Sequence, residues 1–167
     1  VRKNLCKDPY KCLCGLAGVG FKTADATLLE IEKLSNENIR NGKPPIIHFT
    51  SDLRTSPQRC LSCVLYLLSE NEQDGHTQMN LADLRAKCMA LVPACAHHFT
   101  TVIKEKEIYY SKEDMVASLA STYQVEKRIA DRVLQYVNDR SNVWDYDIEQ
   151  YRRIHCVDLS DEQLQAV

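Results

Sequence analysis

The sequence is organised around the stretch Leu13-Cys14-Gly15-Leu16-Ala17-Gly18-Val19-Gly20-Phe21-Lys22-Thr23-Ala24-Asp25. In this stretch an apolar residue, Val19, lies between two glycines, and a small residue, Ala24, follows the second glycine by four positions. Glycine permits the positive φ of a tight hairpin and lets the backbone come close to a ligand. Val19 would plug the two flanking helices together, and Ala24 would let them pack closely. The pattern predicts a helix-hairpin-helix.

Such a hairpin ends at a helix N-terminus whose free amide groups favour an anion, for example a backbone phosphate. Lys22 adds a full positive charge, and the first 22 residues carry five basic residues against one acid, Asp8. We therefore expect binding to nucleic acid with weak sequence preference and marked salt dependence. The expected contacts come from Gly18, Val19, Gly20, Lys22 and Thr23. The alternative interpretation is a glycine-capped corner between two helices that holds no ligand.

The same glycines also raise the question of a Walker A loop, the phosphate-binding loop of many ATPases. Gly15 is followed by four residues and then by Gly20-Phe21-Lys22-Thr23, which is one residue away from that motif. A Walker A lysine directly follows its glycine, after a buried strand. Phe21 breaks this rule, and residues 10–16 are a poor strand candidate. We therefore expect neither a nucleotide site nor catalysis, and no cofactor, in this part of the protein.

Outward from the hairpin, the helical spacing of apolar residues predicts a mainly α protein. The two hairpin helices cover residues 3–34, with Pro9 opening the first. A strong helix is predicted over 57–73, since Ser56-Pro57 is a start signal and Gly75 ends it. Asn80 caps a further helix to residue 91, and a short helix follows over 94–104. A long amphipathic helix is predicted over 121–138, followed by a helical connector through Trp144, Tyr146, Ile148 and Tyr151.

Two short strands, Ile108-Tyr109-Tyr110 and Met115-Val116-Ala117, flank a polar turn and predict a β-hairpin. Residues 36–58 are rich in Asn, Gly, Pro, Ser and Thr, which indicates a linker; within it, Ile46-Ile47-His48-Phe49 could form a strand-like piece. The expected domains are a helix-hairpin-helix at 1–35 (half of a tandem unit), a linker at 36–57, a winged-helix-like unit at 58–118, and a long helix and connector at 119–167.

Three helices and a hairpin are typical of a winged helix-turn-helix, which presents its third helix to a DNA groove. That helix would supply secondary DNA contacts from His97, His98, Thr101 and Lys104. Many such domains are instead protein-docking platforms, and the acidic neighbours Glu105 and Glu107 support that alternative equally.

Composition limits the classes of protein that fit. The net charge of −2 argues against a uniformly basic surface that coats nucleic acid. No apolar run approaches the roughly 20 residues that span a bilayer, and the first residues lack the apolar core of a signal peptide. We expect a cytoplasmic protein with no membrane partner. Because the chain begins without Met and stops at Val167 within a helix-like pattern, we expect an excerpt of a longer protein.

Eight cysteines are present, and in a reducing cytosol such residues mostly behave as small buried hydrophobes. Cys60-x2-Cys63 could combine with Cys88, Cys95 or His97-His98 in a zinc site, because thiolate and imidazole suit zinc. Both residues of the pair fall on a predicted helix, and the remaining ligands do not form a second close-spaced pair. Buried packing is therefore the default expectation, and we assign no metal.

Several patches of the chain resemble the region that precedes the motor in RecD-like (RecD/TraA-type) ATP-dependent DNA helicases. The matching patches are Asp8-Pro9-Tyr10, for the family's Asn-Pro-Tyr; Gly18-Val19-Gly20-Phe21-Lys22-Thr23-Ala24-Asp25, for Gly-Ile-Gly-Phe-Lys-Thr-Ala-Asp; Val64-Leu65-Tyr66-Leu67-Leu68 with Asp74-Gly75-His76-Thr77; Leu119-Ala120-Ser121-Thr122-Tyr123-Gln124-Val125-Glu126; and Leu159-Ser160-Asp161-Glu162-Gln163-Leu164-Gln165-Ala166-Val167. The last resembles the segment immediately before Walker A. Departures include Val19 for Ile, Asp8 for Asn, Leu61 for an arginine, and a longer linker.

The resemblance implies an accessory, non-sequence-specific DNA-binding region of a 5′-to-3′ helicase, exodeoxyribonuclease V alpha-like, that acts in DNA repair or recombination. Its partners would be single-stranded or junction DNA and the rest of the helicase chain. ATP and Mg would belong to the motor beyond this segment, where Gln163 would help to recognise adenine. Two alternatives remain: a protein-interaction or spacer domain whose hairpin serves only packing, and a zinc-stabilised regulatory module.

Overall fold

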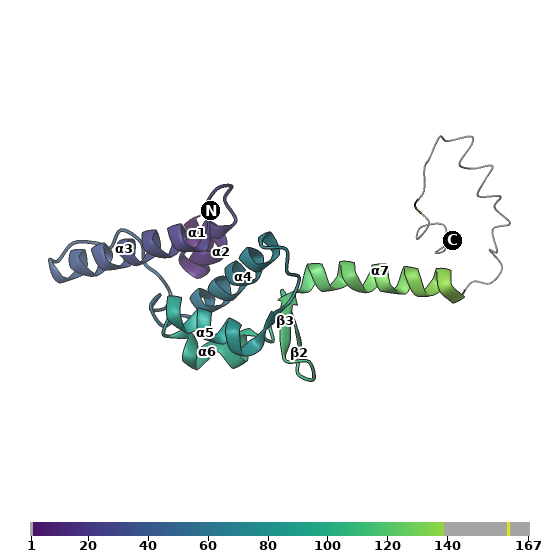
Figure 1. The fold of residues 1–167 in the computed structure, drawn as a ribbon. Helices are drawn as coiled ribbons and strands as arrows, with labels where there is room; N and C mark the ends of the chain where they lie inside the picture. Colours follow the sequence, from purple (N-terminus) through teal and green to yellow (C-terminus); the bar gives the residue numbers. More distant parts are fainter. Residues whose placement is uncertain (1, 139–159, 161–167) are drawn as a thin grey trace. The chain divides into compact units, whose positions relative to one another are not determined.

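The structure of the protein is a computed structural model that describes residues 2–138 and residue 160. The chain forms two compact units, Val1–Lys127 and Arg128–Val167. The connector predicted through Trp144 and Tyr151, and the site residue Gln163, lie outside the described residues. The described part is mainly helical, as the sequence predicts, with one small three-stranded antiparallel sheet (Figure 1).

Local capping signals set the start of the early helices. Helix α1 spans Arg2–Lys7 and α2 spans Pro9–Cys14. Proline opens α2, and the Asp8 carboxylate accepts a hydrogen bond from the Lys11 amide at 3.1 Å. Helix α4, Pro57–Gln73, also opens on proline, with the Ser56 hydroxyl accepting from the Gln58 amide. These starts agree with the sequence because each signal acts within one turn.

The later elements alternate between helices and strands. Strand β1, Met79–Asn80, leads directly into α5, Leu81–Leu91, whose cap is the Asn80 side chain. Helix α6, Cys95–Val102, precedes β2, Ile108–Ser111, and β3, Val116–Leu119. Helix α7, Ala120–Asn138, follows β3 without a break. The β2–β3 hairpin and the helices α5, α6 and α7 were predicted close to these bounds, whereas β1 was not predicted.

The three strands pair in the order β1-β3-β2. Met79 lies opposite Ala117, and Ile108 lies opposite Leu119. The amide of Leu81 also donates to the carbonyl of Met115 at 2.9 Å, so the start of α5 is attached to the turn of the β2–β3 hairpin. The sheet thus joins β1, which precedes α5, to the β2–β3 hairpin, which follows α6.

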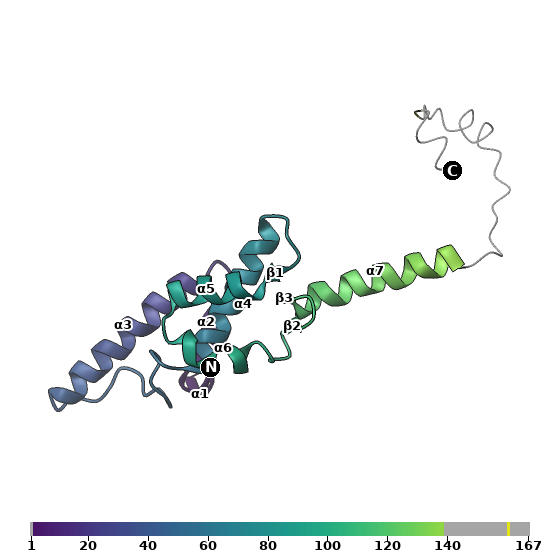
Figure 2. The ribbon, with the colours of Figure 1, turned by 60° about the horizontal axis from the view of Figure 1, so that its bottom comes forward.

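Helix α3 is longer than the sequence predicts, which corrects the expected start of the linker. It spans Phe21–Arg40, so residues 36–40 are helical and the loop begins at Asn41. Ser35 is buried on this helix, and its hydroxyl accepts from the Ile47 amide at 3.3 Å. The Leu53 amide donates to Glu32 at 2.8 Å, and no strand forms within residues 41–56. Figure 2 shows this loop running back alongside α3.

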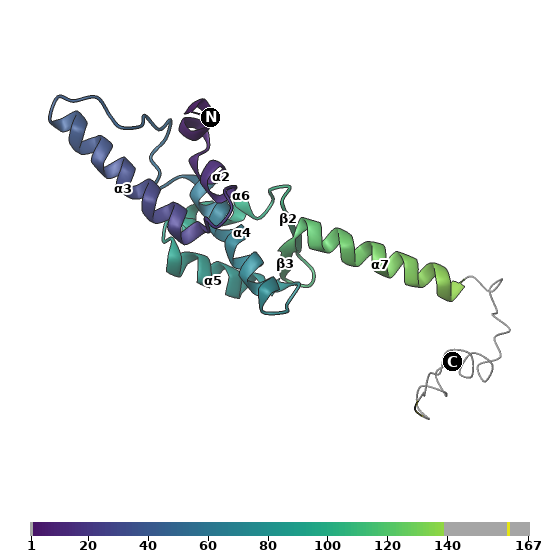
Figure 3. The same cartoon turned by 90° about the horizontal axis from the view of Figure 1, so that it is seen from above.

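Helix α4 lies at the centre of the first unit and contacts α2, α3, α5, α6 and β3. Figures 1 and 3 both show it between α2 on one side and α5 on the other. Tyr10 and Phe21 from the hairpin region join the same buried core as Val64 of α4 and Phe99 of α6. The helices on either side of the glycine turn and the later helices therefore share one core.

Candidate nucleic-acid interface

The glycine-rich stretch forms a tight turn between α2 and α3. Gly18 has a φ of +78°, a backbone conformation that disfavours residues with a Cβ. Val19 is half-buried, and its amide donates to the Leu16 carbonyl at 3.1 Å. Ala24 is fully buried, as expected for a residue that allows close packing of the helices. The turn thus has the positive φ predicted from its glycines.

Helix α3 begins directly at this turn and leaves backbone donors free. Gly20 is the N-cap residue, in an extended conformation, and it provides no side chain to cap the helix. The amides of Phe21, Lys22 and Thr23 find no acceptor among the described residues. Gly20, Lys22 and Thr23 are all exposed. Free amides at the start of a 20-residue helix create a partial positive charge that attracts anions.

Lys22 has a neighbour that the sequence did not reveal. Its ammonium group lies over the ring of Tyr66, a residue of α4, at 5.5 Å from the ring centroid. Tyr66 in turn packs against Phe21, and its hydroxyl donates to Glu70 at 2.9 Å. The aromatic face restricts the lysine while leaving it exposed to solvent. The first turn of α3 therefore carries both free amides and a restrained positive charge.

The hairpin is anchored to α4 by an ion pair. The guanidinium of Arg59 donates from Nε and Nη2 to the two carboxylate oxygens of Asp25, each at 2.7 Å. The Tyr10 hydroxyl donates to the same carboxylate at 2.7 Å. Burial, followed by this hydrogen bond, raises the pKa of Tyr10 well above its usual value. Asp25 thus joins α2, α3 and α4 below the exposed amides.

A cavity of about 450 Å³ lies beside the turn, between the hairpin and α4. Lys11, Gly20 and Tyr66 are among its lining residues. The side chain of Gln58 also lines it, donating to the Lys7 carbonyl at 3.0 Å while its own buried carbonyl oxygen has no partner. The cavity wall also includes the carboxylates of Asp8 and Glu107, which disfavour an anion deep inside. The exposed rim is the better position for a phosphate.

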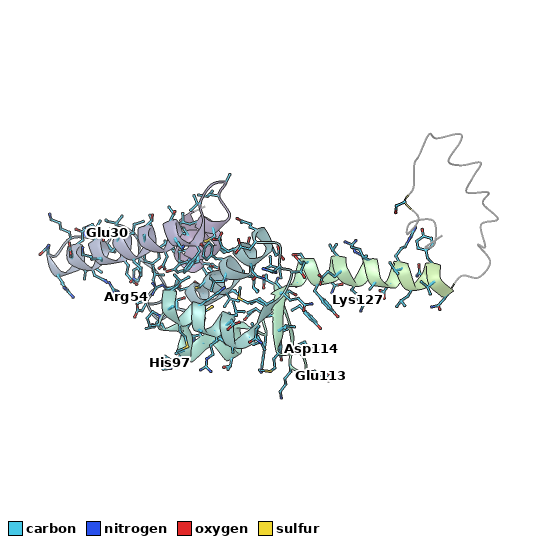
Figure 4. The ribbon with its side chains drawn as sticks, in the orientation of Figure 1. Glu30, Arg54, His97, Glu113, Asp114 and Lys127 are labelled. Atoms are coloured by element: carbon cyan, nitrogen blue, oxygen red, sulfur yellow. The ribbon has the colours of Figure 1, made fainter. Side chains whose placement is uncertain are left out.

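The secondary candidates on and just after α6 differ in their exposure to solvent. His97, Thr101 and Lys104 are exposed, and Figure 4 shows His97 on the outer side of the helix. His98 is half-buried, and its Nε2 lies 2.8 Å from the carbonyl oxygen of Thr55. That hydrogen bond directs His98 to the loop before α4. The structure therefore leaves three of these four side chains free for an external partner.

Four cysteines that the sequence offered as possible zinc ligands meet in the core. Cys60 and Cys63 of α4, Cys88 of α5 and Cys95 of α6 are buried and reduced. The neighbouring Cys60, Cys63 and Cys88 thiols lower the pKa of Cys95. The Cys88 thiol lowers the pKa of Cys63, but the Cys95 thiol and then burial outweigh it and raise that pKa to about 12. Within residues 2–138 and 160, no group of three or more His, Cys, Asp or Glu side chains is arranged to hold a metal ion.

The segment before the glycine loop is a helix, α2, where a Walker A loop would follow a buried strand. None of the described helices combines the length and the apolar character needed to cross a membrane. Comparisons with known proteins give no match among family models, curated proteins or solved structures.

Proposed function

We propose that this chain is a DNA-binding accessory module that grips backbone phosphates, without reading sequence, through a helix-hairpin-helix formed by α2, the glycine turn and α3. The observation that carries the proposal is the exposed start of α3, where the amides of three successive residues are free and one of those residues, Lys22, carries an exposed positive charge. Amides and a lysine favour phosphate oxygens but carry no information about bases. The contacts are those of Gly18, Val19, Gly20, Lys22 and Thr23.

The order of elements from α4 to β3 supports a winged-helix-like unit as the second part of the module. A helix, a short strand, two helices and a two-stranded hairpin follow one another, and the first strand pairs with the last. In such a unit α6 would face nucleic acid or a protein partner. His97, Thr101 and Lys104 would make that contact, since all three are exposed.

We further propose, on the sequence resemblance, that the module belongs to a RecD-like 5′-to-3′ DNA helicase. ATP and Mg would then act in a motor outside this chain, and the module would guide single-stranded or junction DNA towards it. The second candidate is a spacer or protein-interaction domain. The contact of Lys22 with Tyr66 favours this second candidate, because it gives the lysine a role in packing that needs no DNA.

Fluorescence anisotropy with labelled single-stranded and forked DNA, at low and moderate salt, separates the two candidates. A phosphate-gripping hairpin predicts salt-sensitive binding that Lys22→Glu weakens by about tenfold or more. Lys43→Glu, at an exposed lysine beyond α3, is the matched control for net charge and should have little effect. Thermal unfolding of both variants checks that the fold is retained. Binding that Lys22→Glu leaves unchanged, or no binding at low salt, would favour the spacer.

A further inference from the structure

A groove far from the glycine turn in sequence is the strongest unexplained feature of the first unit. It has a volume of about 950 Å³ and lies between α5, α6 and the β2–β3 hairpin. Its buried floor includes Phe99 and Ile103, and its walls include the exposed side chains of Met89 and Met115. Neither the glycine turn nor Lys22 contributes to it.

The charges that line the groove all have one sign. Arg85 of α5, Lys104 just after α6 and Lys112 of the hairpin line it, and no Asp or Glu does. The acids of the hairpin turn, Glu113 and Asp114 (Figure 4), are not among the lining residues. Asp114 accepts a hydrogen bond from the Ser111 hydroxyl. An apolar floor with a basic rim complements a partner that is apolar on one face and acidic around it.

Methionine is concentrated at this groove. The chain has three methionines, and two of them, Met89 and Met115, line the groove with 38% and 50% of their surface exposed. Flexible, polarisable methionine side chains adapt to the varied apolar anchors of a bound helix. Scattered exposed apolar residues are ordinary, but two methionines beside a buried apolar floor form a continuous surface.

Met115 also has the only positive φ of a non-glycine residue in the described part of the chain, +56°. Such a conformation costs about 1 kcal/mol for a residue with a Cβ, and glycine or asparagine would adopt it more easily. The hydrogen bond from the Leu81 amide to the Met115 carbonyl holds this turn against α5. The backbone is strained at a position where an exposed apolar side chain faces the groove.

We infer that this groove is a docking site for an acidic amphipathic helix of a partner protein, a function separate from DNA binding at the glycine turn. Apolar residues on one face of the helix would enter between Phe99, Met89 and Met115. Acidic residues on its flanks would meet Arg85, Lys104 and Lys112. Duplex DNA would use the same three cations but would leave the apolar floor without a complement.

The test uses the whole chain and a fluorescein-labelled helical peptide of about 18 residues, long enough to form a helix in water. One face of the peptide is leucine and the flanks are glutamate, and the control peptide replaces every glutamate with lysine. The inference predicts saturable, salt-sensitive anisotropy binding of the glutamate peptide and at least about tenfold weaker binding of the lysine peptide. Equal binding of both peptides, or none, would overturn it.

Three variants locate the binding site. Arg85→Glu/Lys112→Glu should weaken glutamate-peptide binding by about tenfold or more, because like charges then meet. Lys87→Glu, an exposed lysine of the same helix that does not line the groove, is the matched control. Met115→Gly removes the apolar side chain and the strained conformation together, so binding should weaken while the melting temperature is kept or raised. Peptide binding unaffected by the charge reversal, or lost equally in Lys87→Glu, would contradict the site.

A competition experiment with DNA tests whether the groove binds nucleic acid or a protein partner. Duplex and single-stranded oligonucleotides should not displace the bound peptide, and Arg85→Glu/Lys112→Glu should retain most of the DNA binding attributed to Lys22. If the oligonucleotides displace the peptide and the double variant loses DNA binding instead, the groove serves DNA and the inference fails. That outcome would leave the proposal for the glycine turn to be judged by Lys22→Glu alone.

Discussion

Arg59 holds Asp25 through two parallel hydrogen bonds, from Nε to Oδ1 and from Nη2 to Oδ2, each 2.7 Å long. The two side chains are only 12% and 15% exposed. A two-pronged guanidinium–carboxylate pair fixes both distance and orientation. Since Asp25 belongs to the first turns of α3 and Arg59 to the first turn of α4, the pair sets the direction in which the start of α3 faces solvent.

Removing one member of this pair should destabilise the fold. Asp25→Ala leaves the Arg59 guanidinium partly buried without its carboxylate, and it also removes the acceptor of the Tyr10 hydroxyl. We expect the free energy of unfolding to fall by about 3 kcal/mol, measured by urea denaturation. Lys33→Ala, which breaks an exposed pair with Glu30, is the control and should cost less than about 1 kcal/mol. Similar losses in the two variants would show that the buried pair contributes little.

Stability should decline at alkaline pH because of Tyr10. Burial, with the Asp25 hydrogen bond second, raises the pKa of Tyr10 above its ordinary value of 10.0. In the unfolded chain this tyrosine loses its proton near pH 10, while in the folded chain it keeps it. Its contribution to stability is therefore complete below pH 10 and is lost as pH rises towards the folded pKa, by about 1.4 kcal/mol per pH unit.

Urea denaturation from pH 8 to 11 measures this effect, with Tyr10→Phe as the comparison. The phenylalanine can keep the ring contact with Phe21 but has no proton to lose. Buried thiols such as Cys63, with its raised pKa, add to the alkaline decline in both proteins, so the difference between the two slopes isolates Tyr10. Parallel curves would contradict the assignment.

Two glycine substitutions should separate folding from binding. Gly18→Ala places a Cβ at a φ of +78° and should cost about 1 kcal/mol of stability, although nothing lies within 4 Å of that Cβ. Gly20 has a φ of −79°, and its Cβ would also point into open space. We therefore expect Gly20→Ala to change the melting temperature little but to weaken DNA binding, because its methyl group would stand where a phosphate approaches. Unchanged DNA affinity for Gly20→Ala would count against backbone contact at this residue.

The cysteine cluster should resist alkylation in the folded protein. Cys60, Cys63 and Cys88 are buried and their pKa values are raised, whereas Cys6 and Cys12 are half-buried. Iodoacetamide at pH 8, followed by peptide mapping, should modify Cys6 and Cys12 within minutes and the cluster only after urea unfolds the chain. Rapid labelling of Cys63 in the native protein would show that the core opens easily.

Metal analysis of the same sample tests the zinc-stabilised module. Stoichiometric zinc, with cluster protection that disappears on chelation, would support a structural metal among these thiols. Protection that is independent of chelator, with no stoichiometric zinc, would remove that hypothesis and leave the cysteines as packed core residues.

Features set by short stretches of the chain could be predicted from the sequence. The bounds of α4, the Asn80 cap of α5 and the positive φ at Gly18 each depend on residues within a turn or two. Capping side chains and glycine conformations act over such short distances, so the sequence alone determined where these helices begin and where the chain turns.

Tertiary structure decided the features that depend on distant partners. Strand β1 exists because Met79 and Asn80 pair with β3, and α3 continues to Arg40 while the following loop packs back onto Ser35. The partnership of Asp25 with Arg59, the contact of Lys22 with Tyr66 and the convergence of four cysteines likewise join residues from different helices. Which distant side chains meet depends on how the helices pack around α4, and no periodicity along the chain encodes that choice. The sequence determined where the glycine turn lies, whereas packing determined what surrounds it.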